Sequence, residues 1–277
     1  MDLESSPHSQ KQQAKENVAK QYSTGANLTT RIGLHERFST SSVPWPAWVF
    51  EQIPLRAGVS VLEVGTGTGW LWSKNAQALP ASAHITLTDA SPAMISHLRS
   101  TLSHLPCEMN FEATRVEDLP FPDGSFDIAI ANHMLYLVED RQRALGSLAR
   151  VLRDDAVLIT TTNGSSHLRE MNVLAEKHLK PGHELFGTGY DSSLFNLANA
   201  REQLRQNFAV VEFRNFEDSL VVTEASALVD YVASMSSWKD ALDLDSLRAD
   251  VEEEVARNGH MLITKESGMF LSSQPRR

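Results

Sequence analysis

The sequence predicts an α/β protein with a doubly wound, mostly parallel β-sheet, and two observations lead to this fold class. Residues 59–70, VSVLEVGTGTGW, place a short apolar, β-branched run directly before a glycine-rich turn and the start of a helix. Such a run is typical of a central parallel strand that is covered on both faces. Strand-like and helix-like segments then alternate as far as residue 162, which is typical of parallel strands joined by helices.

The turn after this strand has the composition of a ligand-binding turn, with glycine at Gly65, Gly67 and Gly69. Glycine adopts positive φ readily and lets the backbone lie against a ligand with no Cβ between them. The helix that begins near Trp70 would turn its free N–H groups toward that ligand. A nicotinamide-binding turn needs a third glycine where Trp70 stands, so an oxidoreductase of that kind is the disfavoured alternative.

Composition limits the partners that the protein is expected to have. The chain has 277 residues, a formal charge of −10 and a pI near 5.5, so we expect a small-molecule substrate and no nucleic acid. Cys107 is the only cysteine, which excludes an internal disulfide and a cysteine-rich metal site, and we expect no metal. Because no apolar run reaches roughly 18 residues and no signal peptide is visible, we expect a cytoplasmic protein without a membrane partner. The sequence does not predict an oligomeric state.

Residues 1–53 are expected to form a polar tail and a helical lid. Residues 1–13 are polar, and residues 14–38 carry few apolar side chains, as helices do when they lie over another domain. An irregular linker with serine and proline follows at residues 39–46. Residues 47–53 then read as a helix that leads into the first strand.

The second predicted strand, residues 85–88, follows a helix at 71–79 and ends at Asp89. A carboxylate there, about 20 residues beyond a glycine turn, can accept hydrogen bonds from both ribose hydroxyls of a nucleoside. The alternative is that Asp89 only opens the helix that starts at Ser91 and Pro92. Met94 lies one turn into that helix and could flank an adenine, although a methionine at this spacing is often a core residue.

The fourth predicted strand, residues 126–131, delivers polar residues to its carboxyl end, where open parallel sheets bind their ligands. Asn132 could hydrogen-bond a cofactor, and His133 or Tyr136 could face an acceptor as catalytic groups. A single histidine at this place can equally be a structural residue. The third strand is expected at residues 109–114, a helix at 140–152 and a fifth strand at 156–162.

Taken in order, these motifs resemble the class I S-adenosylmethionine-dependent methyltransferases, small-molecule branch. Glu63 before a G-x-G-x-G turn is similar to the family's first motif, and residues 119–127, LPFPDGSFD, are similar to the run after its third strand. The resemblance covers residues 59–162, about a third of the chain. It implies S-adenosyl-L-methionine as the cofactor and a seven-stranded sheet with one reversed strand. The residues that would bind the cofactor are Glu63, Gly65, Thr66, Gly67, Gly69, Asp89, Ala90, Met94, Val116, Glu117 and Asn132.

The sequence departs from the family pattern at Arg115, where the family has an acidic residue that reaches the adenine amino group. The adenine contact therefore passes to the backbone at Val116 or to Glu117. The resemblance implies methyl transfer to a small molecule, at oxygen or nitrogen first, of the kind that serves secondary metabolism. Such a transfer depends on positioning and desolvation and needs no obligatory nucleophile. The alternative is a protein that binds S-adenosylmethionine without methylating, as a regulator or as a scaffold for substrate rearrangement.

Beyond residue 164 the alternation loosens, so we expect residues 54–164 to be the cofactor-binding core and residues 165–207 to be an inserted helical cap. Residues 208–277 are expected to complete the sheet, with strands at 210–216 and 269–272, an extension of the former at 220–223, and helices at 224–235 and 244–258.

Two expectations concern what lies above the sheet. Tyr22, Arg31 and Arg37 of the lid are expected to contact the cofactor, with the arginines paired to its carboxylate. The alternative is a permanently docked helix pair with solvated arginines. The acceptor is expected to be apolar or aromatic, because aromatic residues are available from these segments, although they could instead pack cap against core. The aromatic residues are Tyr22, Trp45, Trp48, Tyr136 and Phe186.

Overall fold

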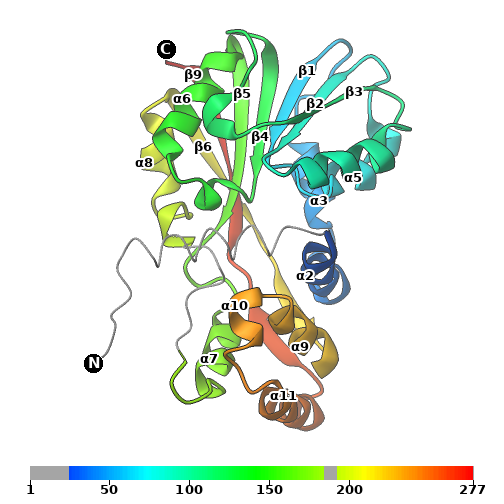
Figure 1. The fold of residues 1–277 in the computed structure, drawn as a ribbon, viewed down its shortest axis with the longest axis vertical. Helices are drawn as coiled ribbons and strands as arrows, with labels where there is room; N and C mark the ends of the chain where they lie inside the picture. The colour runs from blue at the N-terminus through cyan, green and yellow to red at the C-terminus, as the bar shows by residue number, and fades with distance from the viewer. Residues whose placement is uncertain (1–24, 184–191, 277) are drawn as a thin grey trace. The chain divides into compact units, whose positions relative to one another are not determined.

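The computed structural model describes residues 25–183 and 192–276, which belong to two compact units (Figure 1). Of these described residues, we call 41–167, 192–217 and 266–276 the sheet unit, and 25–40, 168–183 and 218–265 the helical unit. Tyr22 and Phe186 lie outside the described residues. Every helix within the described ranges is too short or too polar to cross a lipid bilayer.

The sheet unit contains a seven-stranded sheet in the order β3-β2-β1-β4-β5-β9-β6 (Figure 1). Five strands from β3 to β5 are parallel, and β9 runs antiparallel to both of its neighbours. This confirms the predicted fold class of a mostly parallel sheet with one reversed strand. The strands are β1 (Ser60–Val64), β2 (His84–Asp89), β3 (Glu108–Ala113), β4 (Phe126–Asn132), β5 (Leu152–Asn163), β6 (Phe208–Phe216) and β9 (Ser267–Pro275).

Helices cover both faces of this sheet, and that explains the continuous apolar run of β1. Val61, Leu62 and Val64 are each at most 1% exposed. Val61 belongs to a core that also contains Leu71 and Leu98 from the helices on one face. These helices are α3 (Trp45–Glu51), α4 (Trp70–Lys74) and α5 (Pro92–Leu102), whereas α6 (Arg141–Val151) and α8 (Ala200–Arg205) lie on the other side of the sheet (Figure 1).

Two helices of the sheet unit are shorter than the sequence predicts, and asparagine is the reason in both. The helix expected at 71–79 ends as α4 at Lys74, where the Asn75 side chain donates to the carbonyls of Leu71 (2.7 Å) and Pro46 (3.1 Å). Within the expected cap, the sequence predicts a helix at residues 195–207, but α8 begins only at Ala200, because Asn196 Oδ1 accepts from the Ala198 N–H at 2.9 Å. Such local side-chain bonds compete with helical backbone bonds.

The helical unit has a hydrophobic core of its own, made by helices and a two-stranded sheet. Leu34 and Phe38 of α2 are buried in it together with Leu220, Leu228 and Val251. The described part of the expected lid, helix α2, is thus packed on this core. The elements are α2 (Gly25–Phe38), α7 (Arg169–Lys177), α9 (Ala225–Ala233), α10 (Ser236–Lys239), α11 (Leu244–Asn258), β7 (Ser219–Val222) and β8 (Met261–Thr264).

The chain therefore divides at other places than those expected from the sequence. The segment 165–207 contributes α7 to the helical unit and α8 to the sheet unit. The strand expected to extend β6 is β7, which pairs with β8 in the separate sheet. Asp218 and Lys265, the first and last residues of the segment 218–265, form an ion pair. The Ser39 hydroxyl also donates to Asp218 at 2.8 Å. Periodicity along the chain shows that a strand exists but not which strand it pairs with.

Candidate functional site

Three neighbouring strands of the sheet unit end side by side at the carboxyl edge of the sheet. Val64 of β1 pairs with Thr88 of β2 and with Ala131 of β4. The residues that follow are Gly65, Asp89 and Asn132. The sheet register thus brings together three residues that the sequence places in the site.

The glycine turn has a backbone that other residues would strain. Gly65, Gly67 and Gly69 have φ of 61°, 57° and 70°. A Cβ on Gly65 would lie 2.9 Å from Met134 Cβ, and one on Gly69 would lie 2.5 Å from Leu102 Cδ1. The first glycine lets Met134 pack over the turn, and the third lets α5 pack against the start of α4.

Glu63 lies beneath this turn and is 2% exposed. Its Oε2 accepts hydrogen bonds from Thr66 Oγ1 and from Trp72 Nε1, both at 2.5 Å. Burial raises the pKa of Glu63 to about 7, although these two hydrogen bonds act in the opposite direction. The nearby charge of Asp89 raises the same pKa further. Glu63 therefore connects β1 to the glycine turn and to α4 through hydrogen bonds. Its carboxyl group loses its proton close to neutral pH.

Asp89 joins the glycine turn to the start of α5, and its contact with a ribose stays a prediction. Its Oδ2 accepts from the Gly67 N–H at 3.2 Å, and its Oδ1 accepts from the Ser91 N–H at 2.9 Å. Burial raises the pKa of Asp89, and the two backbone hydrogen bonds oppose that shift. Ser91 itself caps the helix by accepting from the Met94 N–H.

The residues expected around an adenine lie partly in the core. Met94 is 4% and Val116 5% exposed, whereas Ala90 is exposed at the end of β2. The side chain of Glu117 is also buried, and its Oε1 accepts from Arg115 Nη2 at 2.6 Å. Arg115, which stands where the family has an acid, is therefore held by the acid two residues later.

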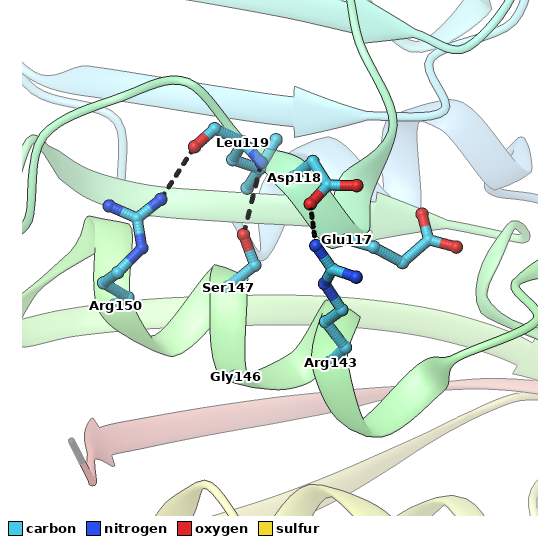
Figure 2. Close-up of a pocket in the computed structure, with 7 residues that line it drawn as sticks. All are labelled: Glu117, Asp118, Leu119, Arg143, Gly146, Ser147 and Arg150. Carbon is cyan, nitrogen blue, oxygen red and sulfur yellow. Dashed lines mark hydrogen bonds and ion pairs between the residues drawn. The ribbon is translucent and has the colours of Figure 1, made fainter.

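A hollow of about 420 Å³ lies between residues 117–119 and α6, and its lining side chains are drawn in Figure 2. The polar groups that line it bind one another. Arg143 pairs with Asp118, Arg150 donates to the Leu119 carbonyl at 2.7 Å, and the Leu119 N–H donates to Ser147 Oγ at 3.4 Å. These contacts hold the segment after β3 against α6.

The end of β4 carries a cluster of side chains rather than a bare backbone turn. Asn132 Oδ1 accepts from the hydroxyl of Thr161 on β5, and the His133 N–H donates to the same hydroxyl at 3.0 Å. His133 has φ of 51°, which is uncommon for a residue with a side chain. Its ring lies 5.0 Å from that of Trp45, measured between centroids. Tyr136, the second expected catalytic residue, is 7% exposed in the next turn.

Trp45 belongs to an aromatic group that includes Trp48 and Phe216. The ring centroids of Trp45 lie 5.3 Å from those of Trp48 and 5.0 Å from those of Phe216. Since β6 and β5 are both antiparallel to β9, β6 ends with Phe216 at the same edge as β4 and β5. Sequence reasoning missed Phe216 and Thr161. The available signal for Thr161 was the run of threonines at 160–162 in a buried strand, where each hydroxyl needs a partner.

Two arginines that were expected at the cofactor lie in the helical unit. Arg31 is 7% exposed, and its Nε donates to the Asn27 carbonyl at 3.2 Å. Arg37 pairs with Glu224 at 2.5 Å and lies over the ring of Phe38. Their contact with a cofactor, like that of Tyr22, stays a prediction.

Comparisons with known proteins agree with this geometry. Residues 61–155 match the family described as a methyltransferase domain. The ubiquinone/menaquinone biosynthesis C-methyltransferase UbiE of Pseudoalteromonas translucida (strain TAC 125) is 28% identical over 165 residues, which is 59% of this chain and 60% of that protein. The match thus spans less than two thirds of the relative's length.

Two solved structures are similar in fold. The YcgJ protein from Bacillus subtilis has a TM-score of 0.55 at 16% identity, over 84% of this chain and 97% of its own. The [4+2]-cyclase SpnF has a TM-score of 0.51 at 20% identity, over 82% and 79% of the two chains. At these identities the likeness concerns the fold alone.

Proposed function

We propose that this protein methylates a small molecule, because residues 61–155 match a methyltransferase domain and the order of its sheet is that expected for the class I S-adenosylmethionine-dependent methyltransferases. The methyl donor would be S-adenosyl-L-methionine. The observation that carries the proposal is the common level of Gly65, Asp89 and Asn132 at the carboxyl edge, within the matched residues.

The residues at this edge suit the cofactor. When bound, S-adenosylmethionine supplies a methyl group on a sulfonium cation. The glycine turn offers a surface without side chains, and Asp89 offers carboxylate oxygens where a nucleoside ribose would lie. Burial disfavours the charged forms of Glu63 and Asp89, and a cationic ligand beside these carboxyl groups would favour the charged forms again. The chain's own contribution to the reaction would be binding, orientation and exclusion of water.

The aromatic group made by Trp45, Trp48, Phe216 and the His133 ring supports an acceptor with an apolar or aromatic face. Trp45, Trp48 and His133 are half-buried, so part of each ring is open to contact. Offset stacking on such rings favours planar ligands. His133 could also take a proton from a hydroxyl or amine as the methyl group is transferred.

The atom that receives the methyl group remains part of the proposal. Oxygen and nitrogen need least help, because a phenol or amine loses its proton readily. Several relatives that are 28–33% identical are C-methyltransferases of ubiquinone and menaquinone biosynthesis, which makes a ring carbon a third choice. The formal charge of −10 favours a small acceptor over a nucleic acid.

Transfer of a labelled methyl group tests the proposal. The protein would be incubated with methyl-labelled S-adenosylmethionine and a panel of phenols, quinols and amines. We expect label in at least one small molecule, together with S-adenosylhomocysteine, and much less with the Asp89→Ala variant. Cofactor binding without transfer to any acceptor would instead support a protein that binds S-adenosylmethionine for another purpose. Tight binding of NADH would overturn the assignment.

A further inference from the structure

A single buried hydroxyl connects the two residues at the end of β4. Thr161 lies on the neighbouring strand β5 and is 0% exposed. Its Oγ1 accepts from the His133 N–H at 3.0 Å and donates to Asn132 Oδ1. The His133 N–H also reaches the Thr161 carbonyl at 3.3 Å. Thr161 therefore holds both Asn132 and the left-handed His133.

The chemistry of the hydroxyl determines how the Asn132 amide is oriented. A threonine hydroxyl has one proton to donate, and burying that proton without an acceptor is costly. Within the described residues, the hydrogen bonds of Thr161 Oγ1 are the two with His133 and Asn132. If the amide were turned over, its NH₂ would face the hydroxyl, and the threonine proton would have no acceptor there. The amide oxygen must therefore face Thr161 and the NH₂ group must face away.

The amide NH₂ of Asn132 is then an available donor at the carboxyl edge. Among the described residues, Asn132 makes one side-chain hydrogen bond, through Oδ1 to Thr161. The residue is half-buried and follows Ala131, the β4 partner of Val64, so it lies beside Gly65 at the start of the glycine turn. The NH₂ group in this place could donate a hydrogen bond to an oxygen atom of a ligand.

We propose that Thr161 is a positioning residue that fixes Asn132 as a hydrogen-bond donor to a ligand oxygen. This inference rests on the proposed function. The oxygen could belong to the carboxylate in the amino-acid part of the cofactor or to the acceptor molecule. Thr161 acts through Asn132 and touches neither ligand itself.

The chain offers a matched control in the preceding residue. Thr160 is also 0% exposed on β5, but its Oγ1 has no hydrogen-bond partner among the described residues. Successive side chains of a strand point to opposite faces, so Thr160 lies on the other side of the sheet from Thr161. Threonine and valine have nearly the same shape, and replacing Thr160 therefore removes a hydroxyl without removing a hydrogen bond.

The test compares Thr161→Val, Thr161→Ser and Thr160→Val in calorimetric titrations of the full chain. Two ligands separate the sources of the oxygen: S-adenosylhomocysteine carries the carboxylate, and 5′-methylthioadenosine lacks the whole amino-acid part. If the cofactor supplies the oxygen, Thr161→Val should bind S-adenosylhomocysteine about tenfold more weakly, equivalent to about 1.4 kcal/mol, with unchanged 5′-methylthioadenosine binding. If the acceptor supplies it, the acceptor KM should rise instead. In either case Thr161→Ser, which keeps the hydroxyl, should behave like the parent protein.

Equal behaviour of Thr161→Val and Thr160→Val toward both ligands and the acceptor would overturn the inference. Equal losses for S-adenosylhomocysteine and 5′-methylthioadenosine would also overturn it, because they would indicate general damage rather than a lost donor. If the unaltered protein bound no S-adenosylhomocysteine, the proposed function itself would be wrong. That result is distinct from a protein that binds normally and is indifferent to the Thr161 hydroxyl.

Discussion

The two halves of the carboxyl edge are built in different ways. At the ends of β1 and β2, the surface is backbone, shaped by three glycines with positive φ and supported by the buried Glu63 and the half-buried Asp89. At the ends of β4 and β5, the surface is made by side chains, with Asn132 and His133 held by Thr161 beside Trp45. The first half depends on the path of the chain and suits a constant ligand. The surface of the second half depends on which side chains it carries. Substitutions can therefore change the second half and leave the backbone surface of the first half as it is.

The halves also differ in charge. Glu63 and Asp89 supply the carboxylates of the first half, and burial raises the pKa of both. The second half is made of an amide, a hydroxyl, an imidazole and aromatic rings. In the proposed function, a cationic ligand at the first half would favour the charged forms of these carboxyl groups, and the rings of the second half would contact the acceptor. The following changes test this division, from the largest expected effect to the smallest.

Replacing the third glycine of the turn should damage the first half most. In Gly69→Ala, a φ of 70° and a Cβ 2.5 Å from Leu102 Cδ1 combine backbone strain with overpacking. We expect a loss of about 2–5 kcal/mol in the free energy of unfolding, measured by urea denaturation.

Gly58→Ala is the matched control for this change. Gly58 also has a positive φ, of 71°, but no atom lies within 4 Å of its added Cβ. Its cost should be the backbone strain alone, roughly 1–2 kcal/mol. Equal losses in the two variants would mean that close packing of α5 against the turn is not what requires a glycine at residue 69.

Removing the charge of Glu63 should change stability in a pH-dependent way. Burial raises the pKa of Glu63 from 4.5 to about 7, so the folded state favours the protonated acid. Protonated Glu63 therefore stabilises the folded state fully below about pH 4.5, and this stabilisation is lost as the pH rises through about 7. Glu63→Gln is neutral throughout, so its stability relative to the parent protein should rise by about 3 kcal/mol between those limits.

Urea denaturation at about pH 5 and about pH 8 would measure this difference. Glu108 offers a control, because it is exposed and hydrogen bonds from His84 and Asn110 lower its pKa instead. Glu108→Gln should not gain stability relative to the parent as the pH rises. A Glu63→Gln variant with the same relative stability at both pH values would show that Glu63 is charged in the folded protein at pH 5.

The strained residue of the second half should affect function more than stability. His133 has φ of 51°, which costs a residue with a side chain roughly 1–2 kcal/mol and costs glycine little. The free energy of unfolding of His133→Gly should therefore lie within about 1 kcal/mol of that of the parent protein. The variant should nevertheless transfer methyl groups more slowly.

Gln274→Gly is the control for that change, because Gln274 is exposed at the end of β9 with a similar φ of 58°. It should keep full methyl transfer. If His133→Gly also kept full transfer, the histidine would be a structural residue and would have no part in the acceptor site.

Local features of the site could be predicted from the sequence, whereas long-range ones could not. The glycine turn and Asp89 follow directly from the ends of two strands, so their place at the edge needed no tertiary information. Helix α11 was likewise predicted at residues 244–258, and the structure shows local caps at both of its ends, Asp243 and Gly259. Thr161 acts on a residue 29 positions away in the chain, and no local pattern expresses that contact.

The division into units was missed for the same reason. The strand at residues 219–222 reads correctly as a strand, but its partner is β8, which follows α9, α10 and α11 in the chain, and not a strand of the main sheet. The shortened α4 depends on Asn75 reaching the Pro46 carbonyl, a contact with a segment that precedes the strand. Pattern reasoning sees the element and not its neighbour.

We expect the nucleoside part of the cofactor to bind at the first half of the edge and the acceptor to bind beside Trp45 at the second. Calorimetric titration of S-adenosylhomocysteine into Asp89→Ala and Trp45→Leu tests this claim most directly. Loss of hydrogen bonds to the Asp89 carboxylate is worth roughly 1.5–3 kcal/mol, so its variant should bind about tenfold more weakly or worse. Trp45→Leu should bind S-adenosylhomocysteine as the parent does. Unchanged affinity in Asp89→Ala, or an equal loss in Trp45→Leu, would contradict the account.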